Sequence, residues 1–237
     1  MSIVVVTGTG TGVGKTVATA ALTAALVAAG QRVAVVKPTQ TGVAGHEPGD
    51  VAVVGELTGC TSLHELLRLA DPLAPDTAAR LRGALLPSVG SLGTRILELA
   101  ADHDVTVVEG AGGVAVRLDT SGGTILTLAR HLTAAGHAPR IVVVTTLTLG
   151  TLNHTELTVD AIRSAGFEPA GLVVGSVPDE LGLAERCNLD ELPRVTGLPV
   201  LARLPAGIGA WEAGRFRAEA MGWFQLEQLL TATGNGY

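Results

Sequence analysis

Short apolar runs alternate with longer amphipathic segments from the start of the chain to about Pro205. The runs are rich in valine and isoleucine and are continuous, as expected of strands that are buried on both faces of a sheet. We expect strands at Ile3–Val6, Val33–Val36, Val105–Val108, Ile141–Val144, Leu172–Val174 and Val200–Leu201. The other segments predict helices at Thr16–Ala29, Ser88–Ala101, Ile125–Ala135, Asn153–Ala165 and Arg215–Leu230.

Residues at the ends of these helical segments carry start and stop signals. Gly30, Gly136 and Gly166 each follow a helical segment, where a left-handed residue ends the helix and glycine adopts that conformation most easily. Asn153 and Glu156 have the spacing of an N-cap and its capping-box partner. We therefore expect a helix to start at Asn153.

The order of the elements predicts one α/β domain over residues 1–237. Strands that alternate with helices form a mostly parallel sheet with helices on both faces. A chain of 237 residues can bury a sizeable core as a single domain. The stretch from Gly42 to Leu86 is the least regular, and we expect loops and short helices there.

Composition excludes several classes of protein. Charged residues make up 16% of the chain and the net charge is −6, which argues against nucleic acid or an anionic membrane as the main partner. Cys60 and Cys187 have neither disulfide-framework nor zinc-site spacing. The apolar start has no basic leader, and the uncharged stretches fall short of the ~20 residues that cross a bilayer. We expect a soluble, cytoplasmic protein.

The sequence "TGTGTGVGKT", Thr7–Thr16, follows the first predicted strand and opens the first predicted helix. Glycines let successive backbone N–H groups turn toward one anion, and the helix N-terminus adds a favourable dipole. In such a loop Lys15 lies on the β and γ phosphates and the Thr16 hydroxyl takes a Mg²⁺ position. Five residues separate Gly8 from Gly14, one more than in the usual loop. The pattern indicates a P-loop NTPase-like fold with a variant loop.

Lysine is scarce in this chain. Of 16 Lys and Arg residues only Lys15 and Lys37 are lysine. Lys37, in "VVKPTQTG", stands at the carboxyl end of the second predicted strand, and open parallel sheets bind ligands outside that end. Because lysine is a compact charge that fits among phosphate oxygens, we interpret both lysines as parts of one site.

Carboxylates occur at two places that suit a metal. "VTVVEGAGG" ends a buried strand in Glu109 and continues as a glycine run, and P-loop enzymes use such a strand-end carboxylate to help hold the metal. Asp50, in a Gly/Pro-rich loop, is a candidate second carboxylate, although a solvated loop aspartate is the commoner case. The six histidines form no HxxxH or triad pattern, and there is no GxSxG elbow. This set of groups suits a reaction in which one substrate attacks another at the γ-phosphate.

Four motifs together resemble the dethiobiotin synthetase family: "GTGTGVGKT" at Gly8–Thr16, "KPTQTG" at Lys37–Gly42, "VEGAGG" at Val108–Gly113 and "LGTLNHTEL" at Leu149–Leu157. The five-residue spacer is that family's form of the loop. The resemblance implies a cyclo-ligase that uses ATP or another nucleoside triphosphate, with Mg²⁺. The implied substrates are 7,8-diaminononanoate and CO₂, joined through a carbamate and a carbamic–phosphoric anhydride, with no partner of nucleic acid or membrane.

The resemblance also implies roles for individual residues. Thr16, Asp50 and Glu109 would hold Mg²⁺, and Lys15 and Lys37 would be catalytic, Lys37 above all. Thr11, Lys37 and Thr41 would contact the diamine or carbamate. In a homodimer, the substrate's carboxylate tail would be received by the partner subunit near Gly150, Thr151 and Asn153. The implied nucleotide-binding set is Gly12, Val13, Gly14, Lys15, Thr16, Val17, Asp50, Glu109, Gly110, Ala111, Gly112, Gly175, Ser176, Pro205, Ala206 and Gly207.

The chain departs from the family pattern at two positions. Gly12 replaces a common glutamate, which removes a carboxylate from near the diamine. Gly175 stands where many members have an asparagine that reads the adenine edge. Phosphate and metal handling are untouched, whereas recognition of the base is changed.

Three alternatives share parts of this pattern. A partitioning-type P-loop ATPase would carry an additional lysine at the position of Gly10, which this chain lacks. The amidating enzymes of cobyrinic or cobyric acid share "VEGAG" but need a further glutaminase domain, for which 237 residues leave no room. A non-catalytic nucleotide-binding module gives no reason for Lys37.

Overall fold

The computed structural model describes residues 1–231. Its strands are β1 (Ser2–Gly8), β2 (Val33–Lys37), β3 (Gln40–Thr41), β4 (Leu63–Glu65), β5 (Arg68–Leu69), β6 (Val105–Glu109), β7 (Arg140–Thr145), β8 (Gly171–Val177) and β9 (Val200–Pro205). Its helices are α1 (Lys15–Ala28), α2 (Asp50–Thr58), α3 (Pro75–Leu81), α4 (Val89–Ala100), α5 (Ile125–Ala134), α6 (Thr151–Ser164), α7 (Leu183–Thr196), the short 3₁₀ helix η1 (Ile208–Ala210), α8 (Ala213–Trp223) and α9 (Leu226–Thr231).

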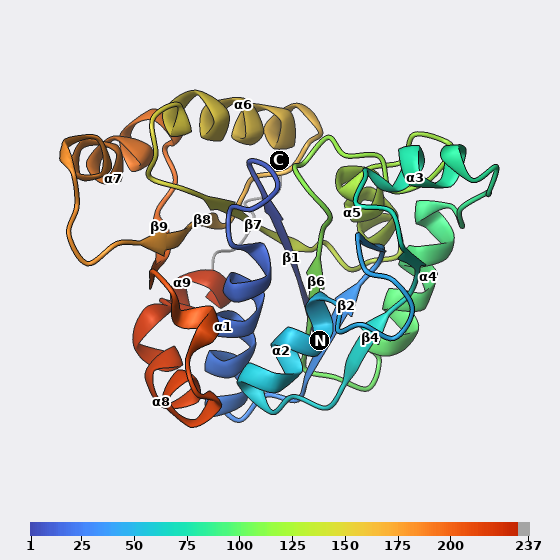
Figure 1. Cartoon of the computed structure of the whole chain (residues 1–237), viewed down its shortest axis with the longest axis horizontal. Coiled ribbons are helices and arrows are strands. Elements are labelled where there is room, and N and C mark those ends of the chain that lie inside the picture. The colour runs from blue at the N-terminus through green and yellow to red at the C-terminus, as the bar shows by residue number, and fades with distance from the viewer. Residues whose placement is uncertain (232–237) are drawn as a thin grey trace.

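Seven strands form one parallel sheet in the order β4-β2-β6-β1-β7-β8-β9 (Figure 1). The six strands expected from the sequence are all present, which confirms the predicted α/β class. The edge strand β4 was not predicted, because its three residues are only half-buried and show no apolar run. A second, two-stranded parallel sheet pairs β3 with β5 beside the carboxyl end of β2.

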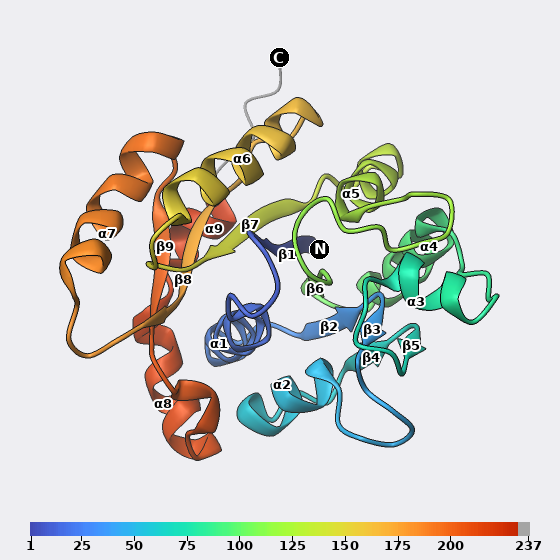
Figure 2. The same cartoon turned by 45° about the horizontal axis from the view of Figure 1, so that its top comes forward.

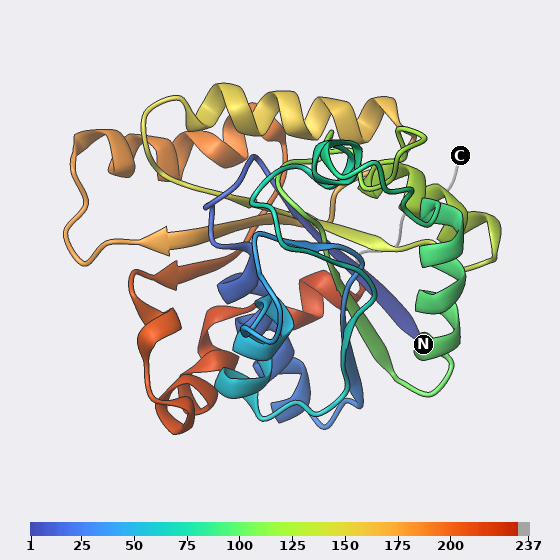
Figure 3. The ribbon, with the colours of Figure 1, turned by 45° about the vertical axis from the view of Figure 1, so that its right-hand side comes forward.

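The two faces of the sheet are covered by different helices. Along β1, Val4 and Val6 pack with α1, α2 and α8 on one face, while Ile3 and Val5 pack with α4, α5, α6 and α7 on the other. This alternation follows from the side-chain period of two in a strand. Figure 3 shows the sheet between these two helical layers.

The predicted helix stops are observed, whereas the predicted start of α6 is not. Gly30, Gly136 and Gly166 follow α1, α5 and α6 with φ values of 80°, 89° and 88°, so the predicted left-handed stops are confirmed. The predicted start of α6 at Asn153 is wrong. The helix starts at Thr151 after an N-cap at Gly150, because the Thr151 hydroxyl is buried and donates to the carbonyl of Thr146 at 2.7 Å.

The predicted helix at Arg215–Leu230 is two helices, α8 and α9. Phe224 breaks it with extended backbone angles, φ −108° and ψ 136°. The side chain of Phe224 is buried, and the residue forms an antiparallel bridge with Ala202 of the edge strand β9. Pairing of Phe224 with the edge strand β9 stabilises the fold more than one continuous helix would.

The sequence pattern predicted residues 42–86 only in part and did not predict helix α7. Residues 42–86 contain α2, α3 and the short strands, so the expected loops and short helices are present together with strands that were not expected. Helix α7 was missed because it is strongly charged and contains Pro193 in its interior. Among residues 1–231, no helix combines the length and apolar character that crossing a lipid bilayer requires.

The topology places the functional loops at one edge of the sheet. All seven strands point the same way, so the segments that follow β1, β2 and β6 meet at their carboxyl ends. The loop between β1 and α1 lies at this edge, and Figure 2 turns it toward the viewer.

Candidate functional site: a phosphate loop with a buried lysine

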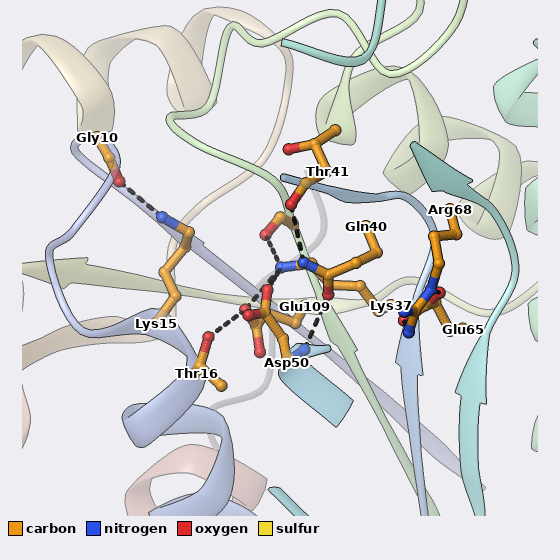
Figure 4. Close-up of polar contacts among 11 residues, drawn as sticks. Gly10, Lys15, Thr16, Lys37, Gln40, Thr41, Asp50, Glu65, Arg68 and Glu109 are labelled. Carbon is orange, nitrogen blue, oxygen red and sulfur yellow. Dashed lines mark hydrogen bonds and ion pairs between the residues drawn. The ribbon is translucent and has the colours of Figure 1, made fainter. Parts of the chain in front are cut away.

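The phosphate loop has the backbone shape that its glycines predicted. Gly12 and Gly14 have φ values of 77° and 93°, in the left-handed region where side chains are strained. The following residue, Lys15, begins α1, so the helix N-terminus faces the loop. The Lys15 ammonium donates a hydrogen bond to the carbonyl of Gly10 at 2.6 Å and lies across the loop opening (Figure 4). This arrangement of N–H groups, helix dipole and ammonium suits a polyphosphate.

Lys37 lies between two carboxylates that come from different elements (Figure 4). Its Nζ is 2.7 Å from Oε1 of Glu109, at the end of the neighbouring strand β6, and 2.5 Å from Oδ2 of Asp50, the first residue of α2. It also donates to the carbonyl of Gly110 at 3.2 Å. The side chains of Lys37 and Glu109 are 4% and 1% exposed, while that of Asp50 is 32% exposed. Asp50 is therefore an ion-pair partner in the site and not a solvated loop residue.

The two lysines have pKa values shifted in opposite directions. Burial lowers the pKa of Lys15, and the nearby positive charge of Lys37 lowers it further. Burial also lowers the pKa of Lys37, but the charges and hydrogen bonds of Glu109 and Asp50 outweigh it, so the pKa of Lys37 is raised. Lys37 is thus a buried cation that stays protonated, with its charge held at the opening of the phosphate loop.

The same corner fits a magnesium ion. The Thr16 hydroxyl donates to Oε1 of Glu109 at 2.9 Å, and the Asp50 carboxylate lies in the same corner, 2.5 Å from Nζ of Lys37. The second oxygen of Glu109, Oε2, is buried and has no hydrogen-bond partner. Mg²⁺ in phosphate sites takes one or two carboxylates with substrate phosphates and waters. Within the described residues no group of three or more His, Cys, Asp and Glu side chains forms an all-protein metal cage.

A cavity of about 380 Å³ opens over this corner. It is lined by Thr11, Gly12, Gly14, Lys15, Thr16, Val17, Lys37, Thr39, Gln40, Thr41, Asp50, Glu109, Ala111 and Gly112. The structure thereby brings together candidates from the first strand end, the second strand end, the loop at Asp50 and the glycine run after Glu109. Gly110 contributes its carbonyl to Lys37.

Two lining residues were missed by the sequence reasoning. Thr39 and Gln40 both lie in "KPTQTG", but neither was assigned a role in the site. Gln40 is 4% exposed and accepts a hydrogen bond from the backbone N–H of Asp50 at 2.9 Å. Its position inside "KPTQTG" was the available signal, but the contact across ten residues depends on the course of the loop between them.

A second, more apolar cavity of about 450 Å³ adjoins the first. Thr11, Thr41, Ala111 and Gly112 line both cavities, and the second is completed by the segment Pro72–Pro75 with Gly42 and Val116. A small molecule with an apolar chain and polar ends could lie across the two.

The expected base-recognition residues lie outside the main cavity, next to the phosphate loop. Val177 pairs with Pro205, and Ala206 donates to the carbonyl of Val177 at 2.8 Å, so the segments around Ser176 and Gly207 are adjacent. Gly175 supports the loop itself: a Cβ atom on it would lie 2.1 Å from the carbonyl oxygen of Val13. Glycine at this position therefore permits close packing of β8 against the loop.

The expected tail-binding residues lie elsewhere, at the start of α6. Gly150, Thr151 and Asn153 line none of the cavities described above. The Thr151 hydroxyl is used within a buried cluster with Thr145, and its backbone N–H already donates to the carbonyl of Thr148 at 3.1 Å. An anion at this helix start would use the next two N–H groups, those of Leu152 and Asn153.

Comparison with known proteins gives close relatives along nearly the whole chain. Residues 3–208 match a family described as an AAA domain. The chain is 54% identical over 224 residues to the ATP-dependent dethiobiotin synthetase BioD of Rhodococcus jostii (strain RHA1), covering 94% of this chain and 95% of that protein. It is 47% identical to the protein of the same name from Streptomyces coelicolor (strain ATCC BAA-471 / A3(2) / M145), covering 94% and 92%.

Solved structures show the fold. The cell division ATPase MinD of Pyrococcus furiosus aligns with a TM-score of 0.57 at 18% identity, covering 94% of this chain and 98% of that chain. The septum site-determining protein MinD of Pyrococcus horikoshii OT3, solved with Mg-ADP, aligns with a TM-score of 0.54 at 16% identity, covering 93% and 90%. At this identity the likeness extends to the P-loop fold and no further, whereas the sequence relatives share about half of their residues. The chain belongs to the ATP-dependent dethiobiotin synthetase family.

Proposed function

We propose that this protein is the cyclo-ligase that converts 7,8-diaminononanoate, CO₂ and a nucleoside triphosphate to dethiobiotin, nucleoside diphosphate and phosphate in biotin biosynthesis. The observation that carries the proposal is Lys37, a buried ammonium held between Glu109 and Asp50 at the opening of the phosphate loop. A module that only binds nucleotide does not require that charge.

The reaction has three steps. One amine of the diamine adds to CO₂ and releases a proton, giving a carbamate. A carbamate oxygen attacks the γ-phosphorus, the bond to the β-phosphate oxygen breaks, and a carbamic–phosphoric anhydride forms. The second amine attacks the anhydride carbon and releases a proton, phosphate leaves as the C–O bond breaks, and the ureido ring closes.

The protein contributes position and charge to these steps. The loop N–H groups and Lys15 hold the β and γ phosphates, and Lys37 neutralises the negative charge where the carbamate meets the γ-phosphate. The Thr16 hydroxyl, Asp50 and Glu109 would hold Mg²⁺, which neutralises phosphate charge when bound. The diamine would lie across the two adjoining cavities, with Thr11 and Thr41 near its amines.

The proposal includes a cytoplasmic location, where nucleoside triphosphates are available. Cys60 and Cys187 are both free thiols, which agrees with a reducing compartment. The proposal is tested by phosphate release from ATP in the presence and absence of the diamine. Phosphate release that requires both diamine and bicarbonate supports the ligase. Phosphate release at the same rate without diamine contradicts it.

A homodimer is part of the proposal, with the substrate tail bound across the interface. Leu149 lies just before α6 and Leu157 lies within it; they are 86% and 61% exposed. Leu157 lines an open groove of about 480 Å³, together with His154, Val116 and Ala161. This apolar surface and the helix start beside it would contact the second subunit and the carboxylate of its substrate.

We expect Lys37→Ala and Asn153→Asp to be nearly inactive alone and to regain activity when mixed into one dimer. The carboxylate introduced at position 153 would repel the substrate carboxylate at the helix start, while the other site of the mixed dimer keeps both Lys37 and Asn153. Activity after co-refolding, with light scattering of each variant, measures this. An active monomer, or no recovery from two variants that fold and dimerise, would contradict the shared site.

The enzyme is expected to accept other nucleoside triphosphates with turnover comparable to that with ATP. Gly175 offers no side chain to read the adenine edge, and a lost hydrogen-bond set of that kind removes roughly 1–3 kcal/mol of discrimination. The loop, Lys15 and the metal ligands contact only what all triphosphates share. Steady-state rates with ATP, GTP, CTP and UTP at equal Mg²⁺ test this. Selectivity for ATP above about a hundredfold, roughly 2.7 kcal/mol, would show that another group reads the base.

A further inference from the structure

Gln40 lies at the start of β3, beside the backbone of Asp50, and both ends of its side-chain amide are bonded (Figure 4). Its Oε1 accepts from the backbone N–H of Asp50 at 2.9 Å, and its Nε2 donates to the carbonyl of Thr41 at 3.1 Å. The residue is 4% exposed. A buried amide with both ends bonded is held in one orientation, so the position of its oxygen is fixed.

Helix α2 needs this contact because it has no cap of its own. The first N–H groups of a helix have no partner within it, and the N-cap residue Gly49 supplies no side chain. A capping side chain at this position would displace the side chains around it: a Cβ atom on Gly49 would lie 2.6 Å from Oε2 of Glu65 and 3.0 Å from Oε1 of Gln40. Gln40 therefore provides from another element the cap that Ser, Thr or Asp provides in most helices.

Gln40 is itself supported by a small frame of charged residues. It pairs with Arg68 in the β3–β5 sheet. The Arg68 guanidinium binds both oxygens of Glu65, at 2.5 Å and 2.8 Å, and donates to the carbonyls of Gly45 and Glu47 at 3.1 Å and 2.7 Å. The loop that leads to α2 is thus fixed to the same frame as Gln40.

We propose that Gln40 is a positioning residue, which acts by capping α2 and thereby holds the Asp50 carboxylate on Lys37 and toward the Mg²⁺ position. The role of that position rests on the proposed function. Asp50 is the first residue of α2 and its side chain is 32% exposed, so burial alone does not fix it. Without the cap the first turn of α2 frays and the carboxylate loses its place 2.5 Å from Nζ of Lys37.

The test is Gln40→Met, which keeps the volume of the side chain and removes both hydrogen bonds. Titration calorimetry without diamine measures the Mg²⁺ concentration that gives half-maximal enhancement of ATP binding. We expect that concentration to rise roughly 10- to 100-fold, the range for losing a group that orients a metal ligand. Binding of ATP in excess EDTA, which depends on the loop and Lys15, should stay within about twofold of wild type.

Ser88→Ala is the matched control for losing a helix cap. Ser88 caps α4 by accepting from the backbone N–H of Ser91 at 3.2 Å, away from the cavity. It should lower the melting temperature as a lost cap does and leave the Mg²⁺ dependence unchanged. If Gln40→Met does not fold, Arg68→Met weakens the same frame from a more exposed position and should shift the Mg²⁺ dependence in the same direction.

A double-mutant cycle with Asp50→Asn separates positioning from general damage. If Gln40 acts through Asp50, Gln40→Met shifts the Mg²⁺ dependence in the wild-type background and not in the Asp50→Asn background. An equal shift in both backgrounds, or no shift in a folded Gln40→Met, overturns the proposal. Failure of the proposed function appears separately, as wild-type protein that binds Mg²⁺ and ATP but forms no dethiobiotin.

Discussion

Lys37→Ala is expected to lower turnover by ~10²–10³ at saturating substrates, because the charge that meets the attacking carbamate is lost. Lys37 lies off the phosphate loop, so much of the nucleotide affinity should remain. The replacement also leaves Glu109, 1% exposed, without its ion-pair partner. Breaking a buried pair from one side costs about 3–5 kcal/mol of folding free energy, so a lower melting temperature is expected as well.

Lys37→Arg separates charge from geometry. It keeps the positive charge beside Glu109 and should recover part of the stability, but the wide guanidinium does not replace a point charge in a site bounded by Glu109 and Asp50. Turnover should therefore remain low while the melting temperature rises toward wild type. Near-normal turnover of a folded Lys37→Ala at saturating diamine and ATP would remove Lys37 from the chemical step.

Gly175→Asn is expected to weaken the binding of every nucleoside triphosphate and to give no selectivity for ATP. The first side-chain carbon would lie 2.1 Å from the carbonyl oxygen of Val13, so the loop must move before the amide can reach a base. Overpacking of this kind costs typically ~1–3 kcal/mol. If that strain falls on the loop, affinity falls by about 5- to 150-fold, since each 1.4 kcal/mol is tenfold.

Two further variants control this prediction. Gly175→Ala should produce most of the loss, because the clash involves the Cβ atom itself. Gly222→Ala, in α8, adds a Cβ with no atom within 4 Å and should leave nucleotide binding unchanged. Calorimetric titration of ATP and CTP into each variant measures the effect. Tighter binding of ATP to Gly175→Asn than to wild type would show that the loop accommodates the side chain at no cost.

The sequence predicted the parts of the fold that depend on local pattern. Continuous valine-rich runs indicated six of the seven strands of the main sheet, and a glycine-rich turn before a helix indicated the phosphate loop. The start of α6 was wrong because a buried threonine contact outweighs the signal at Asn153, which is exposed. The single helix predicted at Arg215–Leu230 was wrong because Phe224 pairs with the sheet edge.

Site residues could be predicted where the signal lies within one segment of the sequence. Contacts between distant segments could not be predicted in this way. Lys37 and Glu109 were singled out because each ends a strand, and parallel strands end at the same edge. Asp50 was a candidate from its loop and from the family resemblance, but its place beside Lys37 depends on Gln40, Gly49 and the Arg68–Glu65 pair, whose contacts join residues from three short elements. No period or motif along the chain encodes that convergence.

Mass spectrometry of one incubation tests whether the protein is this cyclo-ligase. The protein is incubated with 7,8-diaminononanoate, ¹³C-bicarbonate, Mg²⁺ and ATP, and phosphate is measured in the same sample. The proposed function predicts dethiobiotin that carries the label in its ureido carbon, formed in equal amount with phosphate and lost when ATP is omitted. Phosphate without labelled dethiobiotin, from protein that binds Mg²⁺ and ATP, would contradict it.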